Sequence, residues 1–154
     1  MDEALTMASY ICGFAAAFCF IFSNITGNFS QVDRLWSVLP AVYAWVFYQY
    51  NPHPKTKCMA IFATMWGLRL SYNFYRKGGY KSGEEDYRWP YLRTIIKNKF
   101  LLLIFNLTFI SIYQNIILLL IASPAWQPDV TWKVHDCYIA IAWMLLFGFE
   151  VTAD

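Results

Sequence analysis

Charged and amide side chains lie inside two long apolar blocks of this chain. Arg69, Asn73 and Arg76 are spaced i, i+4, i+7 in one block, so they share one face of a helix. Glu150 and Asp154 lie four residues apart in another block and share a face as well. Guanidinium groups suit phosphate oxygens, whereas carboxylates accept hydrogen bonds from hydroxyl or amide groups. The two faces together could form a polar pocket that holds different parts of one ligand.

An ion pair between Arg69 and Glu150 is the simplest way to keep both groups inside a membrane. A charged side chain at the bilayer centre costs about 2.5–3.5 kcal/mol on insertion scales, and pairing relieves that cost. Two plainer interpretations stay open. Arg69 lies about 10 Å from the end of its block at 1.5 Å per residue, so its side chain could reach the head groups. The pair could also serve only to lock two helices together.

The elements that carry these residues are predicted to be membrane helices. The chain has 154 residues, of which 58% are hydrophobic and 14% are charged. Soluble domains have about 45–50% apolar and 25% charged residues. The sequence therefore predicts an all-α membrane helix bundle, a single domain over residues 1–154. Its five predicted spans are residues 7–25, 35–50, 58–75, 100–122 and 137–154. Pro40 is expected to kink the second span.

The orientation follows from the lysine and arginine residues of the loops. Eight of them lie in the first and third loops, against three on the other side of the membrane. This asymmetry predicts a lumenal N-terminus, with the loop 76–99 and the C-terminal end in the cytosol. The glycosylation sequons at Asn24 and Asn28 would then be unused. Within the loop, residues 77–83 are predicted to form turns, and residues 91–99 to form an amphipathic helix on the membrane surface.

Several other functions are excluded or disfavoured by the sequence. A net charge of +2 is too small and too scattered for nucleic-acid binding. The two histidines and four cysteines are too sparse for a metal site, and the cysteines are expected to be small buried apolar residues. No Ser–His–Asp set, internal repeat or heptad pattern is visible. Polar residues of the fourth span are expected to form hydrogen bonds between helices, namely Thr108, Ser111 and Asn115.

Several stretches, taken together in their order and spacing, resemble a known family. They are QVDRLWSVLP at 31–40, WGLRL at 66–70, Asn73, RKGGY at 76–80, EDYRW at 85–89 and FEVTAD at 149–154. The chain resembles the "domain of unknown function 1295" family. That family belongs with the steroid 5-alpha-reductase-like membrane proteins, and isoprenylcysteine carboxyl methyltransferases stand in the same wider circle.

The resemblance implies a multi-helix protein of the endoplasmic reticulum membrane. Reductases of this fold bind NADPH in a cavity open to the cytosol and reduce a polarised carbon–carbon double bond of a lipid or sterol-like substrate. By that likeness Arg69 would contact the cofactor. Glu150 and Asp154 would match an Asn-and-Asp pair that holds it. With Asn73 and Arg76 of the same polar stripe, these are the expected cofactor-binding residues, and the implied enzyme is an oxidoreductase acting on CH–CH groups.

The sequence departs from the reductase pattern at two places. Val38 and Trp66 stand where steroid reductases have a Glu and a Tyr that polarise the substrate carbonyl. The family continues past the Asp154 motif into further helices, so this chain is expected to be a fragment without the part that completes the cofactor pocket. Two alternatives remain: a methyltransferase that uses S-adenosylmethionine, and a non-catalytic membrane scaffold.

Overall fold

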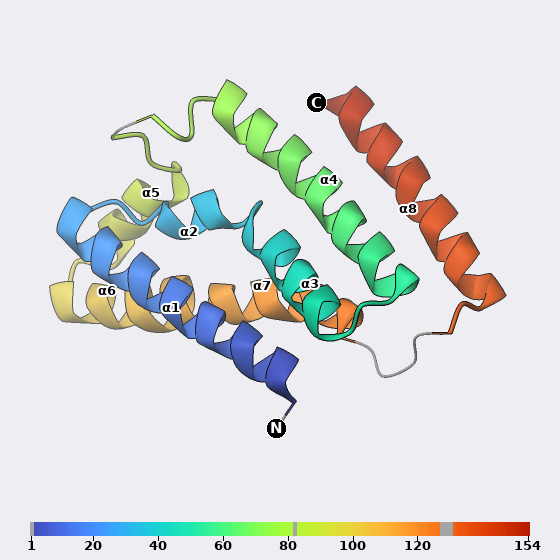
Figure 1. Cartoon of the computed structure of the whole chain (residues 1–154). Coiled ribbons are helices and arrows are strands. Elements are labelled where there is room, and N and C mark those ends of the chain that lie inside the picture. The colour runs from blue at the N-terminus through green and yellow to red at the C-terminus, as the bar shows by residue number, and fades with distance from the viewer. Residues whose placement is uncertain (1, 82, 127–130) are drawn as a thin grey trace.

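The computed structural model describes residues 2–81, 83–126 and 131–154, and the regular elements in these ranges are all helices (Figure 1). The all-α prediction is confirmed for them. The elements are α1 (Glu3–Thr26), α2 (Gln31–Leu35), α3 (Leu39–Tyr50), α4 (Pro54–Arg76), α5 (Arg88–Ile95), α6 (Lys99–Phe105), the π-helix η1 (Asn106–Tyr113), α7 (Gln114–Ala122), the 3-10 helix η2 (Ser123–Ala125) and α8 (Val134–Ala153).

Three helical stretches in the described residues are long and apolar enough to cross a membrane: α1, Lys99–Ala125 and α8. They correspond to the predicted spans 7–25, 100–122 and 137–154, and they indicate an integral membrane protein. α3 has 12 residues. At 1.5 Å per residue it covers about 18 Å of a hydrocarbon core about 30 Å thick. α4 has 23 residues but carries two lysines and two arginines. The predicted count of five spans is therefore not supported.

The second predicted span, 35–50, is interrupted rather than kinked. α2 ends at Leu35, residues 36–38 form a turn, and α3 begins at Leu39. Pro40 lies in the first turn of α3, where its missing N–H would have had no partner within the helix. The expectation of a kink at Pro40 was therefore wrong: the proline helps to begin a helix.

The bundle core is built on a face of small residues along α1. Ala4, Ala8, Cys12 and Ala15 are buried there against aromatic and aliphatic side chains of α3 and α7. Small residues let helix backbones approach closely in a membrane. Among the cysteines, Cys12 and Cys19 are buried as predicted and Cys58 is half-buried, but Cys137 is exposed on α8.

The π-helix η1 and the start of α7 carry polar side chains that face α1. Asn106 donates from Nδ2 to Ser23 Oγ at 2.7 Å, and Asn115 lies 3.8 Å from Cys19 Sγ. The predicted interhelical role is therefore confirmed for Asn115. It is wrong for Thr108, which is exposed and donates to Ile104 O of its own helix. It is also wrong for Ser111, whose buried hydroxyl has no hydrogen-bond partner in the described residues. A π-turn widens the helix locally, and such turns are frequent at functional sites.

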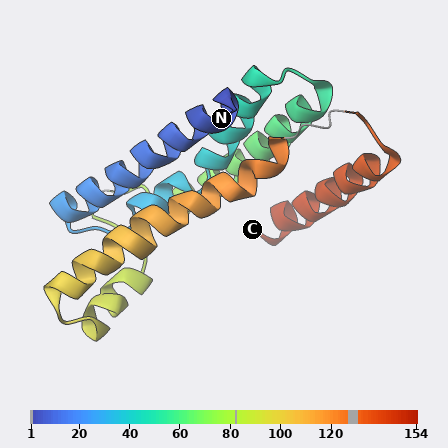
Figure 2. The same ribbon diagram turned by 90° about the horizontal axis from the view of Figure 1, so that it is seen from below.

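α8 lies at the edge of the bundle beside α4, and the two helices run in the same direction (Figures 1 and 2). No residue of α8 is buried. The beginning of α1 lies beside the end of the Lys99–Ala125 stretch, since Trp126 Nε1 donates to Asp2 Oδ2 at 2.7 Å. Figure 1 shows that the long elements alternate in direction along the chain, and that α4 and α8 end on the same side of the bundle.

Candidate functional site

α4 and α8 contact each other at matching positions seven residues apart. Near their beginnings Lys55 Nζ lies 2.9 Å from Asp136 Oδ1. In the middle the rings of Phe62 and Trp143 stack with 4.3 Å between centroids. Toward their ends Arg69 pairs with Glu150. Seven residues make almost two helical turns, so each helix keeps these side chains on one face.

This seam was missed by the sequence analysis, which found no heptad pattern. The chain does contain a signal for it. Lys55 and Arg69 are 14 residues apart, and so are Asp136 and Glu150, with opposite charges at matching steps. An aromatic residue stands midway in each helix. Two blocks with complementary charges at equal spacing are typical of parallel helices that pack side by side.

All five predicted site residues come together where the two helices end. Arg69 Nε donates to Asp154 Oδ2 at 2.5 Å, and its Nη1 donates to Glu150 Oε2. Arg76 donates to the main-chain oxygen of Asp154, and the Asn73 side chain lies near the Asp154 carboxylate. The predicted ion pair between Arg69 and Glu150 is therefore confirmed, and Asp154 extends it to a three-residue network. We call these five residues the helix-end cluster.

The charges of the helix-end cluster decide which ligand groups it can hold. Two guanidinium groups face two carboxylates, so the cluster is close to neutral. Arg69 already directs two of its donor atoms at carboxylates. A phosphate there would have to displace them. The loop that follows offers further basic groups, since Lys77 comes directly after Arg76 and the Lys81 side chain folds over Gly78.

The Gly-Gly turn beside the cluster has a steric cause. Gly78 has φ +83°, which favours glycine. A Cβ on Gly79 would lie 2.4 Å from the Phe74 ring, which also packs edge-on against Tyr80. The predicted turns in 77–83 are thus confirmed for the described residues; Ser82 lies outside them.

A cavity of about 570 Å³ lies beside the seam, between α3, α4, α7, η2 and α8. Its walls are mostly apolar and include Phe62, Trp66 and Trp143. Trp66 stands one helical turn before Arg69, so the cavity reaches the neighbourhood of the helix-end cluster. Its other end is polar and includes Lys55, His135 and Asp136. The volume is typical of sites for small organic ligands.

A second hollow, of about 450 Å³, lies between α3 and α4. Val38 and Gly67 line it, together with Trp45 and Ser71. Val38 and Trp66, the positions expected to correspond to the carbonyl-polarising pair of steroid reductases, therefore line different hollows.

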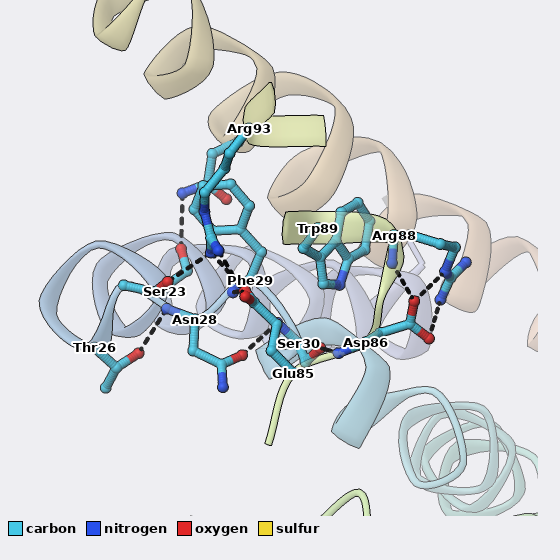
Figure 3. A network of polar contacts seen from close by, with 12 residues as sticks. Ser23, Thr26, Asn28, Phe29, Ser30, Glu85, Asp86, Arg88, Trp89 and Arg93 are labelled. Atoms are coloured by element: carbon cyan, nitrogen blue, oxygen red, sulfur yellow. Dashed lines mark hydrogen bonds and ion pairs between the residues drawn. The ribbon is translucent and has the colours of Figure 1, made fainter. Parts of the chain in front are cut away.

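The EDYRW motif holds the first loop against the third (Figure 3). Glu85 accepts hydrogen bonds from the Phe29 N–H at 2.6 Å and from both terminal nitrogens of Arg93, at 2.7 and 2.6 Å. Arg93 also donates to Gly27 O and lies over the Phe29 ring, 4.6 Å from its centroid. These contacts join the end of α1 to α5. The motif therefore has a structural role on this side of the bundle.

The second half of the motif holds α2. The Asp86 N–H donates to Ser30 Oγ at 2.9 Å, and the buried Trp89 donates from Nε1 to Asp33 Oδ2 at 2.8 Å. Arg88 pairs with Asp86 and Asp33. The hydrogen bond from Arg88 holds the pKa of Asp86 below its ordinary value, so this carboxylate stays charged at neutral pH. The helix predicted at 91–99 exists as α5, but it covers Arg88–Ile95 and ends before α6 begins at Lys99.

Comparisons with known proteins place the chain among relatives. A family described as "Protein of unknown function (DUF1295)" matches residues 19–154. A protein of Schizosaccharomyces pombe described as uncharacterized is 42% identical over 139 residues, which is 84% of this chain and 40% of that protein. The chain thus spans two fifths of the length of this curated relative. No solved structure matches.

Proposed function

Since the chain belongs to the DUF1295 family, we propose that the whole protein is a membrane oxidoreductase that binds NADPH at the helix-end cluster and reduces a carbon–carbon double bond of a lipid. The observation that carries the proposal is the convergence of Arg69, Asn73, Arg76, Glu150 and Asp154 at one end of α4 and α8. The apolar cavity next to them supports a lipid as the second ligand. The resemblance to steroid 5-alpha-reductase-like proteins supplies the type of reaction, by analogy.

The residues present fit a dinucleotide because acidic and basic groups lie together. Glu150 and Asp154 can accept hydrogen bonds from ribose hydroxyls or from the nicotinamide amide. Phosphates fit better at Arg76 and the following Lys77 than at Arg69, because Arg69 is engaged by both carboxylates. In this arrangement Arg69 is a positioning residue that orients the two acids. When bound, NADPH supplies the hydride.

The first experiment measures binding of the cofactor by the detergent-solubilised full-length protein. NADPH at 100 times its dissociation constant should raise the free energy of unfolding by about 2.7 kcal/mol, seen as a higher melting temperature. Asp154→Asn removes a charged acceptor and should weaken this stabilisation. The matched control is Asp86→Asn, in a carboxylate of the EDYRW motif outside the helix-end cluster. Stabilisation by S-adenosylmethionine instead of NADPH would point to a methyltransferase, and stabilisation by neither would point to a scaffold.

We also propose that the helix-end cluster faces the cytosol, in the endoplasmic reticulum membrane. The lysine and arginine distribution supports this orientation. So does the state of the two sequons, of which Asn24 lies near the end of α1 and Asn28 in the loop that follows. Asn28 Nδ2 donates to Glu84 O at 2.8 Å, and Asn24 Nδ2 donates to Phe20 O at 2.6 Å. Both nitrogens that would carry a glycan are engaged.

Endoglycosidase treatment of the protein expressed in eukaryotic cells tests this orientation. We expect no mass change at Asn24 or Asn28. A tag with a sequon, added before residue 1, should be glycosylated because the N-terminus lies in the lumen. A glycan on Asn28 together with an unmodified tag would show the reverse orientation.

A further inference from the structure

One end of the cavity beside the α4–α8 seam is polar, although most of the cavity walls are apolar. This end carries an ion pair between Lys55 and Asp136. Lys55 Nζ lies 2.9 Å from Asp136 Oδ1 and 3.0 Å from Oδ2, so the ammonium contacts both carboxylate oxygens. Both side chains are nearly buried, at 9% and 10% exposure. His135 Nε2 lies 3.5 Å from the same carboxylate. This group lies where α4 and α8 begin, at the end opposite to the helix-end cluster.

Charge decides which lipid head group this end of the cavity accepts. The positive charge of Lys55 and the negative charge of Asp136 cancel one another. An anionic head would face the Asp136 carboxylate, and a cationic head would face the Lys55 ammonium. An uncharged hydroxyl can donate to the carboxylate and accept from the ammonium, so it matches both. A buried pair with nothing else to do would be replaced by apolar residues at little cost, or even with a gain in stability.

The length and the apolar walls of the cavity determine how the apolar body of a bound lipid lies. Lys55 and Trp66 both line it, and they are 11 residues apart on α4, which is about 16 Å at 1.5 Å per residue. Between them the walls are apolar and aromatic, with Phe62 and Trp143 stacked on one side. Beyond Trp66 comes the helix-end cluster. A ligand with its head at Lys55 would thus bring the distant part of its apolar body toward that cluster.

We propose that this cavity binds an uncharged lipid alcohol, with its hydroxyl between Lys55 and Asp136 and its apolar body directed toward Trp66. The inference rests on the proposed function in taking this lipid as the substrate. It differs from a carbonyl-polarising site because the recognised polar group lies at the far end from the reaction. The double bond to be reduced then lies in the remote part of the lipid.

Two fluorescent lipids that differ only in the head group test the proposal: cis-parinaric acid and the corresponding alcohol. Tryptophan residues line the cavity, so energy transfer to the tetraene reports binding to the full-length protein in nanodiscs without nucleotide. The measurement is made at about pH 9, so that the acid is largely ionised although the bilayer raises the pKa of its carboxyl group. The alcohol should bind about tenfold more tightly than the acid, a difference of about 1.4 kcal/mol. Equal affinity, or preference for the acid, would overturn the proposal.

The variant Asp136→Asn should reverse which of the two lipids binds more tightly. The asparagine can still accept the hydrogen bond from the Lys133 N–H that begins α8, but Lys55 loses its countercharge. The preference should reverse, with the acid now bound about tenfold more tightly than the alcohol. If the alcohol is still preferred to the same degree, Lys55 and Asp136 do not contact the head group and the proposal fails.

A second variant tests the place of binding independently of the charges. Ala140 of α8 lines the cavity and Ala142 is exposed on the same helix. Ala140→Phe should fill the chamber and weaken binding of the alcohol at least about tenfold, whereas Ala142→Phe should leave it unchanged. Equal effects of both variants would place the lipid elsewhere. Because nucleotide is absent, loss of lipid binding with NADPH stabilisation intact overturns this inference alone, and the converse overturns only the cofactor assignment.

Discussion

Gly67→Ala is expected to destabilise the protein more than any other single-methyl change in α4. A Cβ at residue 67 would lie 2.2 Å from the main-chain oxygen of Ser37. The obstacle is backbone, and it is held in place by the hydrogen bond from Ser71 Oγ to Ser37 Oγ at 2.7 Å. α4 must therefore move away from the turn between α2 and α3. Overpacking costs about 1–3 kcal/mol, and we expect the upper end because no flexible side chain can yield.

The measurement is the fraction of detergent-solubilised protein that stays monodisperse after heating. Gly13→Ala is the matched control, since no atom outside its own helix lies within 4 Å of a Cβ at that position. Alanine in the middle of α1 should be neutral or stabilising by about 0.5–1 kcal/mol. Equal stability of the two variants would mean that α4 does not pack against residue 37 as closely as described.

Arg69→Leu should cause the second large loss of stability. Removing the guanidinium leaves Glu150 and Asp154 side by side without a counterion, so their mutual repulsion is no longer offset. The loss should be smaller than for a fully buried pair, because the Glu150 side chain is 48% exposed. Glu150→Leu alone should cost much less, since Arg69 keeps its bond to Asp154. Thermal stability of the purified variants measures both effects.

A double-mutant cycle separates coupling from simple damage. Adding Glu150→Leu to Arg69→Leu should recover part of the lost stability, because one of the two unpaired acids is removed. Adding Asp154→Asn as well should recover more. Strictly additive losses would mean that these residues do not share one network, in spite of their contacts.

The helix-end cluster could be predicted from sequence because helical periodicity and the cost of buried charge both act locally. Arg69, Asn73 and Arg76 had to share a face, and a carboxylate had to lie near Arg69. The second span could not be predicted in the same way. Its break at 36–38 lies where the Ser37 backbone approaches Gly67 of α4 closely, and hydropathy carries no information about a contact between distant segments.

The contacts that join the first loop to the third could not be predicted from the sequence either. Glu85 and Arg93 are eight residues apart, and nothing in their spacing shows that they meet Phe29 and Gly27 of the first loop. Several acids and bases in the two loops could pair equally well on sequence grounds. The choice is made in three dimensions by Trp89, which is buried and brings α5 against α2. Burial of one aromatic side chain thus selects the ionic partners around it.

The α4–α8 seam can form only after both of its helices have been synthesised. Its paired residues are 81 positions apart in the chain. At about 5–20 residues per second, a ribosome needs about 4–16 s to make that stretch. During this interval the α4 half of the seam exists, and the carboxylates that pair with Arg69 do not yet exist. We therefore expect released chains that end before residue 150 to depend on membrane chaperones, and to be degraded faster than released chains that extend past residue 154.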